Sequence, residues 1–448
     1  MSERVTSLSK PFSAYYYRKV PEEDALLTHT GPETPCGEYL RRFWNPVGHS
    51  SALKDLPIPV RIMGEDLVLF RDKKGRAGLL QRHCCHRGAS LEFGKIEEYG
   101  IRCCYHGWQF DVDGRILDMP NEKNNSPFKD RLFQGAYPLH EYGGLVFAYM
   151  GPPAPELKPD FPIYDTFEVP GYHLEPAEPP GVANIKPCNW MNIIDNVVDP
   201  AHEPFLHTSI SGCQFFDKDG RPVSEAADLG EIIFEETPLG ILTQEVRRIG
   251  DTIWVRSIDC IYPNMAQVAR MPVFPPEFNG TKEISYVPLL TRWRVPVDDE
   301  RTIEFGFVRM KEGQVNPYID NKVIAYRTNY GDREFEDRQR TPGDYDAQVS
   351  QRTISRHALE HLTGTDKGVA MFRRDLRAGI AAVARGEDPK GIVRGRSGKI
   401  PTYCNETLLY SPPKPGMDPV QELRDAARAN YQKVLRQSVA MAPNPQCS

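Results

Sequence analysis

Short apolar runs separated by turn residues dominate the chain from residue 58 to residue 151. The stretch 60–71 predicts two strands around Gly64, and the stretch 142–151 predicts a further strand that closes this block. Gly- and Asp-containing turns, such as the one that ends at Gly75, separate the strands. The pattern predicts a small β-sandwich, which ends at the Pro-rich segment 151–159.

The second half of the chain carries a different pattern. Residues 231–309 contain β-prone runs such as 252–258 and 302–308. Residues 350–383 have apolar side chains at helical spacing, which predicts a helix there. Strands surrounded by helices predict an α+β domain. We therefore expect an N-terminal arm with a helix at 1–44, an all-β domain at 45–155 and an α+β domain at 156–448.

Composition and charge narrow the range of partners. The 448 residues carry a net charge of −6 and contain no Lys/Arg-rich run, so nucleic acid is not an expected partner. No run of about eighteen apolar residues predicts a membrane span, and the start of the chain lacks the apolar core of a signal peptide. The ten cysteines are therefore expected to be the reduced thiols of a cytoplasmic protein, able to bind metal.

Two short motifs combine cysteine with histidine. Cys84-x-His86 is followed, after sixteen residues, by Cys103-x-x-His106. Two thiolates and two imidazoles in this order suit a [2Fe–2S] cluster of the Rieske kind, in which two Cys hold one iron and two His hold the other. A tetrahedral zinc site is the alternative, but zinc motifs usually begin with two Cys and end with two His.

Three neighbours of these ligands have other interpretations. Cys85 and Cys104 do not keep the ligand spacing, and we expect both to be buried thiols. His83 is also adjacent to the first motif, and we expect it to be a spectator rather than a ligand.

A second pair of histidines follows in the other half of the chain. His202 and His207 lie five residues apart, which does not fit one helix face, so we expect a bend near Pro204. Two His and one carboxylate can occupy one face of a non-haem ferrous ion and leave positions for O2 and substrate. Asp199 fits better as an outer carboxylate that accepts a hydrogen bond from a ligating His, and could also cap a helix that starts at Pro200.

The carboxylate ligand is expected from another part of the chain. Asp298 and Asp299 look like a hairpin turn between strands, where paired Asp are common. Asp344 and Asp346 precede a predicted helix and lie among apolar and amide residues. The residues alone do not choose between Asp344 and Asp346.

Both groups of candidate ligands occur together, in this order, in one family. The chain resembles the terminal oxygenase (alpha) component of the Rieske non-haem iron oxygenases, and looks closest to the phthalate dioxygenase-like branch. The matching runs include Cys84-Cys-His-Arg-Gly-Ala-Ser-Leu, Cys103-Cys-Tyr-His-Gly-Trp, Asp199-Pro-Ala-His-Glu-Pro-Phe-Leu-His and Glu360-His-Leu-Thr-Gly-Thr-Asp.

The resemblance implies a β-rich Rieske domain followed by a helix-grip catalytic domain with a central antiparallel sheet. The implied cluster ligands are Cys84, His86, Cys103 and His106. The implied ligands of a mononuclear Fe(II) are His202, His207 and Asp344, with Asp346 as the fallback.

The same resemblance implies an oxidoreductase that uses O2. A reductase, with or without a ferredoxin, would pass electrons from NAD(P)H to the cluster, and a small aromatic substrate would be hydroxylated, dihydroxylated or O-demethylated. Asp199 would connect the cluster His106 of one subunit to His202 of its neighbour, which implies a homo-oligomer, either a trimer or a hexamer.

Two alternatives to this function, and the choice of substrate, stay open. The chain could be a Rieske electron-transfer protein without oxygenase activity, or a zinc-stabilised binding protein. Arg247, Arg248 and Arg256 lie on predicted strands and could hold an aromatic carboxylate. Arginines on strands more often face solvent, and that interpretation is favoured at this point.

Overall fold

The computed structural model describes residues 5–11, 18–122, 128–179, 184–215, 222–269, 282–316, 331–395 and 398–440. The strands of the first half are β1 (Trp44–His49), β2 (Ile58–Ile62), β3 (Glu65–Arg71), β4 (Ala77–Gln81), β5 (Lys95–Ile96), β6 (Ile101–Arg102), β7 (Gln109–Phe110), β8 (Ile116–Asp118), β9 (Leu139–Tyr142) and β10 (Leu145–Tyr149). Those of the second half are β11 (His173–Pro176), β12 (Asn184–Lys186), β13 (Glu231–Glu236), β14 (Gly240–Ile249), β15 (Thr252–Ile261), β16 (Met265–Val268), β17 (Lys282–Ser285), β18 (Leu290–Asp298), β19 (Arg301–Met310) and β20 (Asn405–Tyr410).

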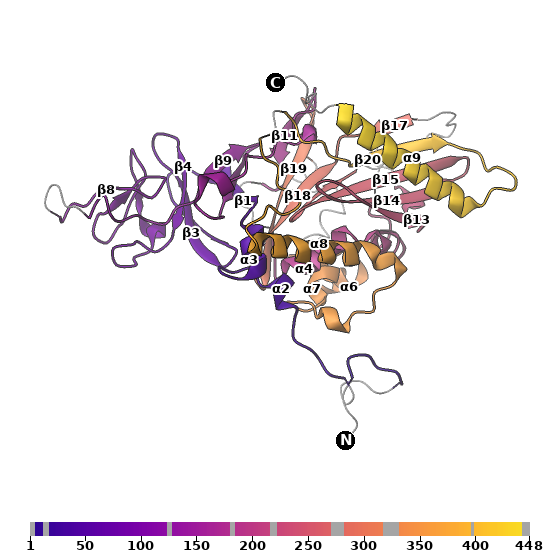
Figure 1. The fold of residues 1–448 in the computed structure, drawn as a ribbon, viewed down its shortest axis with the longest axis horizontal. Helices are drawn as coiled ribbons and strands as arrows, with labels where there is room; N and C mark the ends of the chain where they lie inside the picture. Colours follow the sequence, from indigo (N-terminus) through magenta and orange to yellow (C-terminus); the bar gives the residue numbers. More distant parts are fainter. Residues whose placement is uncertain are drawn as a thin grey trace.

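The helices lie at the N-terminus and in the second half of the chain. They are α2 (Ala25–Thr28), α3 (Pro35–Leu40), α4 (Trp190–Val197), α6 (Phe335–Arg340), α7 (Asp344–Ser350), α8 (Lys367–Ala384) and α9 (Pro419–Ala440). None of the described helices is long and apolar enough to cross a membrane. Together with the strands they confirm the expected α+β class (Figure 1).

The first half is built from three small antiparallel sheets, at the left of Figure 1. Strands β2–β4 form one sheet and β5–β8 another, and a buried cluster that includes Val68, Phe70 and Phe110 lies between them. Cys84 and Cys103 belong to the same buried cluster. The core of this half therefore ends at the two loops that carry the Cys-His motifs.

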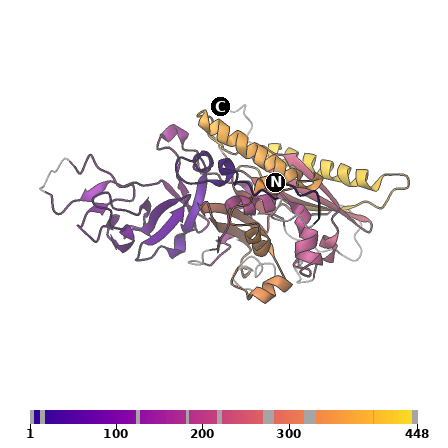
Figure 2. The same cartoon turned by 90° about the horizontal axis from the view of Figure 1, so that it is seen from below.

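The second half is organised around one large antiparallel sheet. Its main path is β11-β19-β18-β16-β15-β14-β13, and β20 pairs with β15 and with β17. Helix α9 packs on β13, β14 and β15, whereas α8 and α4 lie on the other side of the sheet (Figures 1 and 2). This sheet, with helices on both faces, confirms the predicted catalytic domain with a central antiparallel sheet.

The N-terminal helices pack on the catalytic half. The hydroxyl of Thr34 accepts a hydrogen bond from the Gly37 N–H and Pro35 occupies the first position of α3, which is a favourable start for a helix. The side chain of Asn189 donates to the Thr28 carbonyl (2.8 Å), and the Trp190 indole donates to the Leu27 carbonyl (3.1 Å). The domain limits 1–44, 45–155 and 156–448 stay a prediction.

The helix predicted over 350–383 is shorter in the structure. Helix α8 begins only at Lys367, and 351–366 are irregular apart from two short 3-10 turns. Asn192 explains part of this difference, because its side chain donates to the Arg352 carbonyl (2.9 Å) and accepts from the Ser355 N–H (3.2 Å). The Asn189 N–H donates to the Thr353 carbonyl (2.7 Å), so the backbone of residues 352–355 bonds to the first residues of α4 and its N-cap.

Two candidate metal centres

Cys84 and Cys103 begin two loops with the same backbone geometry. In each loop the Cys N–H donates to the carbonyl five residues later (2.9 and 2.8 Å). The N–H of Gly88 or Gly107 donates back to the carbonyl of the same Cys (2.8 and 3.1 Å). These glycines have φ values of +73° and +75°, a region that side chains with a Cβ rarely adopt. The glycine that ends each motif therefore closes a tight ligand loop.

The side chains of the two loops meet in pairs. The Cys84 and Cys103 thiols contact each other on the buried side, where these residues are 4% and 3% exposed. On the outer side, the ring centroids of His86 and His106 are 4.6 Å apart, and His86 stacks on Trp108 at 4.5 Å. Paired thiols and paired imidazoles are the donor set that a Rieske cluster needs. The residues therefore fit the [2Fe–2S] group.

Cys85 and Cys104 are exposed, so the prediction that they are buried thiols is wrong. In each loop the buried position is taken by the preceding Cys, Cys84 or Cys103. His83, the expected spectator, is also exposed, and its Nδ1 lies 3.1 Å from the Gly88 carbonyl.

The second pair of histidines lies on an irregular segment. His202 ends a 3-10 turn (Pro200–His202), and His207 lies in a π-helical turn (Phe205–Ser209). Glu203 and Pro204 join the two turns with helical backbone angles, and the bend expected near Pro204 stays a prediction. Turns of the π type occur frequently at functional sites.

Each of these imidazoles is oriented through its Nδ1 atom. The Nδ1 of His202 is hydrogen-bonded to the backbone carbonyl of Asp199, and the Nδ1 of His207 lies 3.0 Å from Oε1 of Gln214. Both partners are acceptors, so Nδ1 carries a proton and Nε2 is the atom left to bind a metal.

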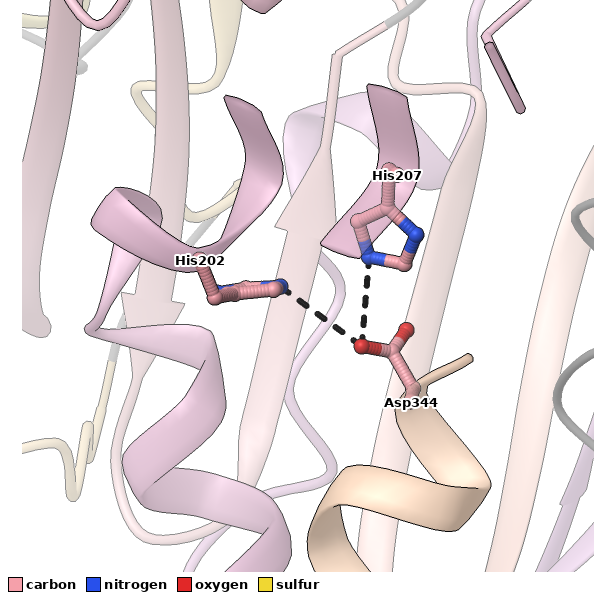
Figure 3. Close-up of side chains that lie close together, drawn as sticks. All are labelled: His202, His207 and Asp344. Carbon is pink, nitrogen blue, oxygen red and sulfur yellow. Dashed lines mark ion pairs between the residues drawn. The ribbon is translucent and has the colours of Figure 1, made fainter. Parts of the chain in front are cut away.

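The two Nε2 atoms face the carboxylate of Asp344, the first residue of α7 (Figure 3). Its Oδ1 lies 3.5 Å from Nε2 of His202 and 3.2 Å from Nε2 of His207. Potential ligand atoms of all three residues lie within 4.8 Å of one another. Two His and one carboxylate around one point are the donor set of a non-haem ferrous site.

The electrostatics of this site suit a cation. Burial disfavours the charged imidazoles, but the Asp344 carboxylate outweighs it, raising the pKa of His202 to about 9 and also that of His207. Burial works against the ionised form of Asp344 too, yet the two histidines bring its pKa well below its usual range. A divalent ion would take the place of the protons shared by these groups, so the residues fit mononuclear iron.

Asp346 and the hairpin pair Asp298 and Asp299 lie in other environments. The Asp346 carboxylate accepts from Arg333 (2.8 Å) and Arg338 (2.6 Å), and it also caps the start of α7. Asp298 ends β18 and Asp299 follows it in the turn to β19, as predicted. Of the four candidate carboxylates, only Asp344 faces the two histidines.

Asp199 is placed beside His202, but not as expected. Its backbone carbonyl, rather than its carboxylate, accepts the His202 hydrogen bond, and its side chain caps no helix. Its Oδ1 is buried and has no hydrogen-bond partner. Burial raises the pKa of this carboxyl, although His202 counteracts the effect. The electron-bridging role of Asp199 stays a prediction.

Sequence reasoning missed two amides at this site. The Nδ2 of Asn196 lies 3.3 Å from Nε2 of His202 and 3.4 Å from Oδ1 of Asp344. Gln214 holds the ring of His207. Asn196 is on α4 close to the histidine motif, which is a weak signal, whereas nothing in the sequence points to Gln214.

The strand arginines do not face solvent, so that interpretation is wrong for two of them. Arg247 and Arg256 are 1% and 2% exposed and form ion pairs with Glu245 and Glu203. They belong to β14 and β15 of the central sheet, where a buried charge needs a paired partner.

Comparisons with known proteins agree with this geometry. Residues 43–140 match the Rieske [2Fe-2S] domain family. The tert-butanol monooxygenase / tert-amyl alcohol desaturase oxygenase subunit of Aquincola tertiaricarbonis is 38% identical, over 89% of this chain and 86% of that protein. The phenoxybenzoate dioxygenase subunit alpha of Ectopseudomonas oleovorans is 35% identical, over 91% and 99%.

A solved structure of NdmA from Pseudomonas putida CBB5, a QL mutant with caffeine, superposes with a TM-score of 0.57. It covers 81% of this chain and 100% of that chain at 18% identity, which supports the fold alone. On the sequence matches, the chain belongs to the Rieske non-haem iron oxygenases, in the phthalate dioxygenase-like branch. It is the oxygenase component of such a system, with a Rieske [2Fe–2S] cluster and a mononuclear iron as cofactors.

Proposed function

We propose that this oxygenase component holds its mononuclear iron with Nε2 of His202, Nε2 of His207 and an oxygen of Asp344. The observation that carries this proposal is the convergence of three ligand atoms from two separate elements on one point. When bound, the iron supplies the chemistry of O2 activation. The chain supplies the orientation: two fixed Nδ1 contacts and the start of α7 aim the donors at that point. The proposed cluster ligands are Cys84, His86, Cys103 and His106.

Electrons would reach the cluster from NAD(P)H through a reductase, with or without a ferredoxin. The half-exposed rings of His86 and His106 form the outer edge of the cluster loops, where a partner can approach. In the proposed assembly, a trimer or a hexamer, the carboxylate of the partly buried Asp199 accepts a hydrogen bond from the cluster histidine of a neighbouring subunit. Electron transfer through hydrogen-bonded contacts would then connect the two centres.

The proposed substrate is a small aromatic molecule that is hydroxylated, dihydroxylated or O-demethylated. The name of the phenoxybenzoate relative supports an aromatic carboxylate. Arg247 and Arg256 are not the carboxylate receptor that the sequence suggested, because Glu245 and Glu203 already neutralise them. A carboxylate group would have to be bound by other side chains.

An electron-transfer protein without oxygenase activity would have no use for the three converging ligands or for the large sheet that supports them. We therefore do not favour that alternative. We place the protein in the cytoplasm, because its described cysteines are all free thiols and a reducing compartment would keep them so.

The test begins with metal analysis of the purified full-length chain. We expect two acid-labile sulfides per chain and iron in excess of the two cluster irons. The protein is then combined with a surrogate NADH-dependent reductase and given matched aromatic acids, alcohols and methyl ethers. Substrate-dependent consumption of NADH and O2 with a hydroxylated or demethylated product supports the proposal. A cluster that is reduced normally in a protein with no further iron and no product would refute it.

A further inference from the structure

A series of buried charges connects the central sheet to the segment that carries His202 and His207. Arg256 on β15 is opposite Glu245 on β14 in the strand register, and the two residues are 2% and 1% exposed. The Arg256 guanidinium donates to both carboxylate oxygens of Glu203 (2.7 and 2.6 Å) and to Oε1 of Glu245 (2.9 Å). Glu203 directly follows His202 and belongs to residues 200–209, which we call the iron segment. One ion pair therefore connects this segment to the sheet.

The series is balanced in charge. Glu245 also binds Arg247, so the order along the series is Arg247, Glu245, Arg256 and Glu203, with alternating sign. A neutral series of this kind has no net attraction for an anionic ligand. Its remaining effect is geometric, because each buried charge is held by the next one.

The iron segment needs an external anchor. A 3-10 turn, a proline and a π-helical turn follow one another over 200–209, so no regular helix fixes the direction of the two imidazoles. Other hydrogen bonds of this segment run to its own backbone, to Gln214 and to Asn196 on α4. Within the described part of the chain, the Glu203–Arg256 pair is the only hydrogen-bonded link from 200–209 to a strand of the central sheet.

We propose that Arg256 is a positioning residue for the iron centre: through Glu203 it fixes His202 and His207 relative to the central sheet. This inference rests on the iron ligands proposed above. All three hydrogen bonds come from Nη1 of Arg256, at the end of a planar guanidinium that holds its direction better than a lysine ammonium on a flexible stem. Sites held by such supporting contacts lose their geometry when the contacts are removed.

The test uses a double variant, Arg256→Met with Glu203→Leu. The double variant removes the ion pair between Arg256 and Glu203 but leaves Glu245 paired with Arg247, so no buried charge is left alone. We expect the affinity for Fe(II), measured anaerobically against a competing chelator, to fall about 10- to 100-fold. We also expect the EPR spectrum of the ferrous nitrosyl adduct to broaden, because the imidazoles no longer keep one arrangement. The visible spectrum of the cluster should not change.

A matched control removes an ion pair that lies elsewhere. Arg41 and Glu65 are joined at 3.0 Å between α3 and β3, with side chains 5% and 13% exposed. The control Arg41→Met with Glu65→Leu should lower the melting temperature but leave the iron affinity and nitrosyl spectrum as in the parent. If the control loses iron to the same extent as the double variant, general destabilisation is the cause and the inference is overturned.

A single substitution, Arg256→Lys, covers the case in which the double variant does not fold. It keeps the charge, and we expect a folded protein with a broadened nitrosyl spectrum and an intermediate iron affinity. An unchanged affinity and spectrum in either folded variant would overturn the positioning role. A parent protein that binds no mononuclear iron would instead contradict the proposed function, so the two failures are distinguishable.

Discussion

The cluster loops and the iron segment each present two histidines, but they are held in different ways. In the cluster loops, main-chain hydrogen bonds and two glycines with positive φ set the geometry, and His86 and His106 are partly exposed. In the iron segment, main-chain structure is irregular, and side chains from the central sheet and α4 hold it.

The helix that carries Asp344 is also held by side chains from the sheet. Helix α7, which begins at Asp344, is anchored where Lys186 on β12 donates to Oε1 of Gln348 (2.8 Å). Lys186 also pairs with Glu304 on β19 at 3.1 Å. Both halves of the iron site are thus tied to the sheet by buried charges, whereas the cluster is held by its own loops. Changes to distant side chains should therefore disturb the iron and spare the cluster.

The largest expected effect comes from Asp344→Asn. Among the candidate carboxylates, Asp344 alone faces both histidines. Removing a group that only hydrogen-bonds to a metal ligand lowers metal affinity about 10- to 100-fold. Loss of the ligand itself should therefore lower the affinity for Fe(II) by more than about 100-fold. Iron analysis and the visible spectrum measure the two centres separately, and the cluster should stay fully loaded. The companion variant Asp346→Asn breaks only pairs with Arg333 and Arg338, and it should keep its iron. The reverse result would move the ligand assignment to Asp346.

The next effect concerns the connection between the centres. Asp199→Asn keeps the backbone carbonyl that binds His202, so both metals should be retained. Coupled turnover should fall about 10- to 100-fold, as for other outer contacts of metal ligands. The measurement is the rate at which the reduced cluster is re-oxidised in a single turnover with substrate and O2. Unchanged single-turnover and steady-state rates would refute the bridge.

The cluster loops offer a matched pair of glycines for a smaller effect. In Gly88→Ala the new Cβ meets no atom within 4 Å, so the cost is the positive φ alone, about 1 kcal/mol. In Gly107→Ala the Cβ would also lie 2.9 Å from Cγ of Pro120. Thermal unfolding followed by the cluster absorbance should show a larger decrease for Gly107→Ala. Equal decreases would show that the loop adjusts freely around Pro120.

This difference in construction explains what the sequence could predict. The proposed cluster ligands lie in two local motifs whose spacing already reflects the loop geometry, so the sequence alone was enough to propose Cys84, His86, Cys103 and His106. The carboxylate proposed for the iron site comes from a distant helix, and the residues left Asp344 and Asp346 open because both lie in the first turn of α7. Only the direction of the side chain separates them, and that direction depends on tertiary packing.

Other misses have the same origin. The exposure of Cys85 and Cys104 depends on which residue of each loop turns towards the core, which spacing does not encode. The sequence could not show that Arg256 pairs with Glu203, because the two residues are brought together only when β15 lies under the iron segment. Residues 351–366 have helical spacing, yet contacts with Asn192 replace the helix.

The last expected effect depends on pH and concerns another carboxyl in the charged region of the sheet. Glu406 on β20 is opposite Arg256 in the strand register, accepts a hydrogen bond from the Trp254 indole (2.5 Å) and is 1% exposed. Burial raises its pKa from 4.5 to about 8, against the opposing effect of Arg256. The folded state therefore prefers the protonated carboxyl, and stability that is fully present below about pH 4.5 is lost as the pH rises towards 8.

Glu406→Gln keeps the shape of this side chain and removes its titration. Relative to the parent, the melting temperature of the variant should rise between pH 5 and pH 8, by about a few degrees, and the gap should stop widening above the folded-state pKa. The exposed Glu300→Gln serves as the control and should show no such trend. A gap that is constant with pH would show that Glu406 is ionised in the folded protein. The series of buried charges would then contain three carboxylates, of Glu203, Glu245 and Glu406, against two arginines, which is one negative charge in excess.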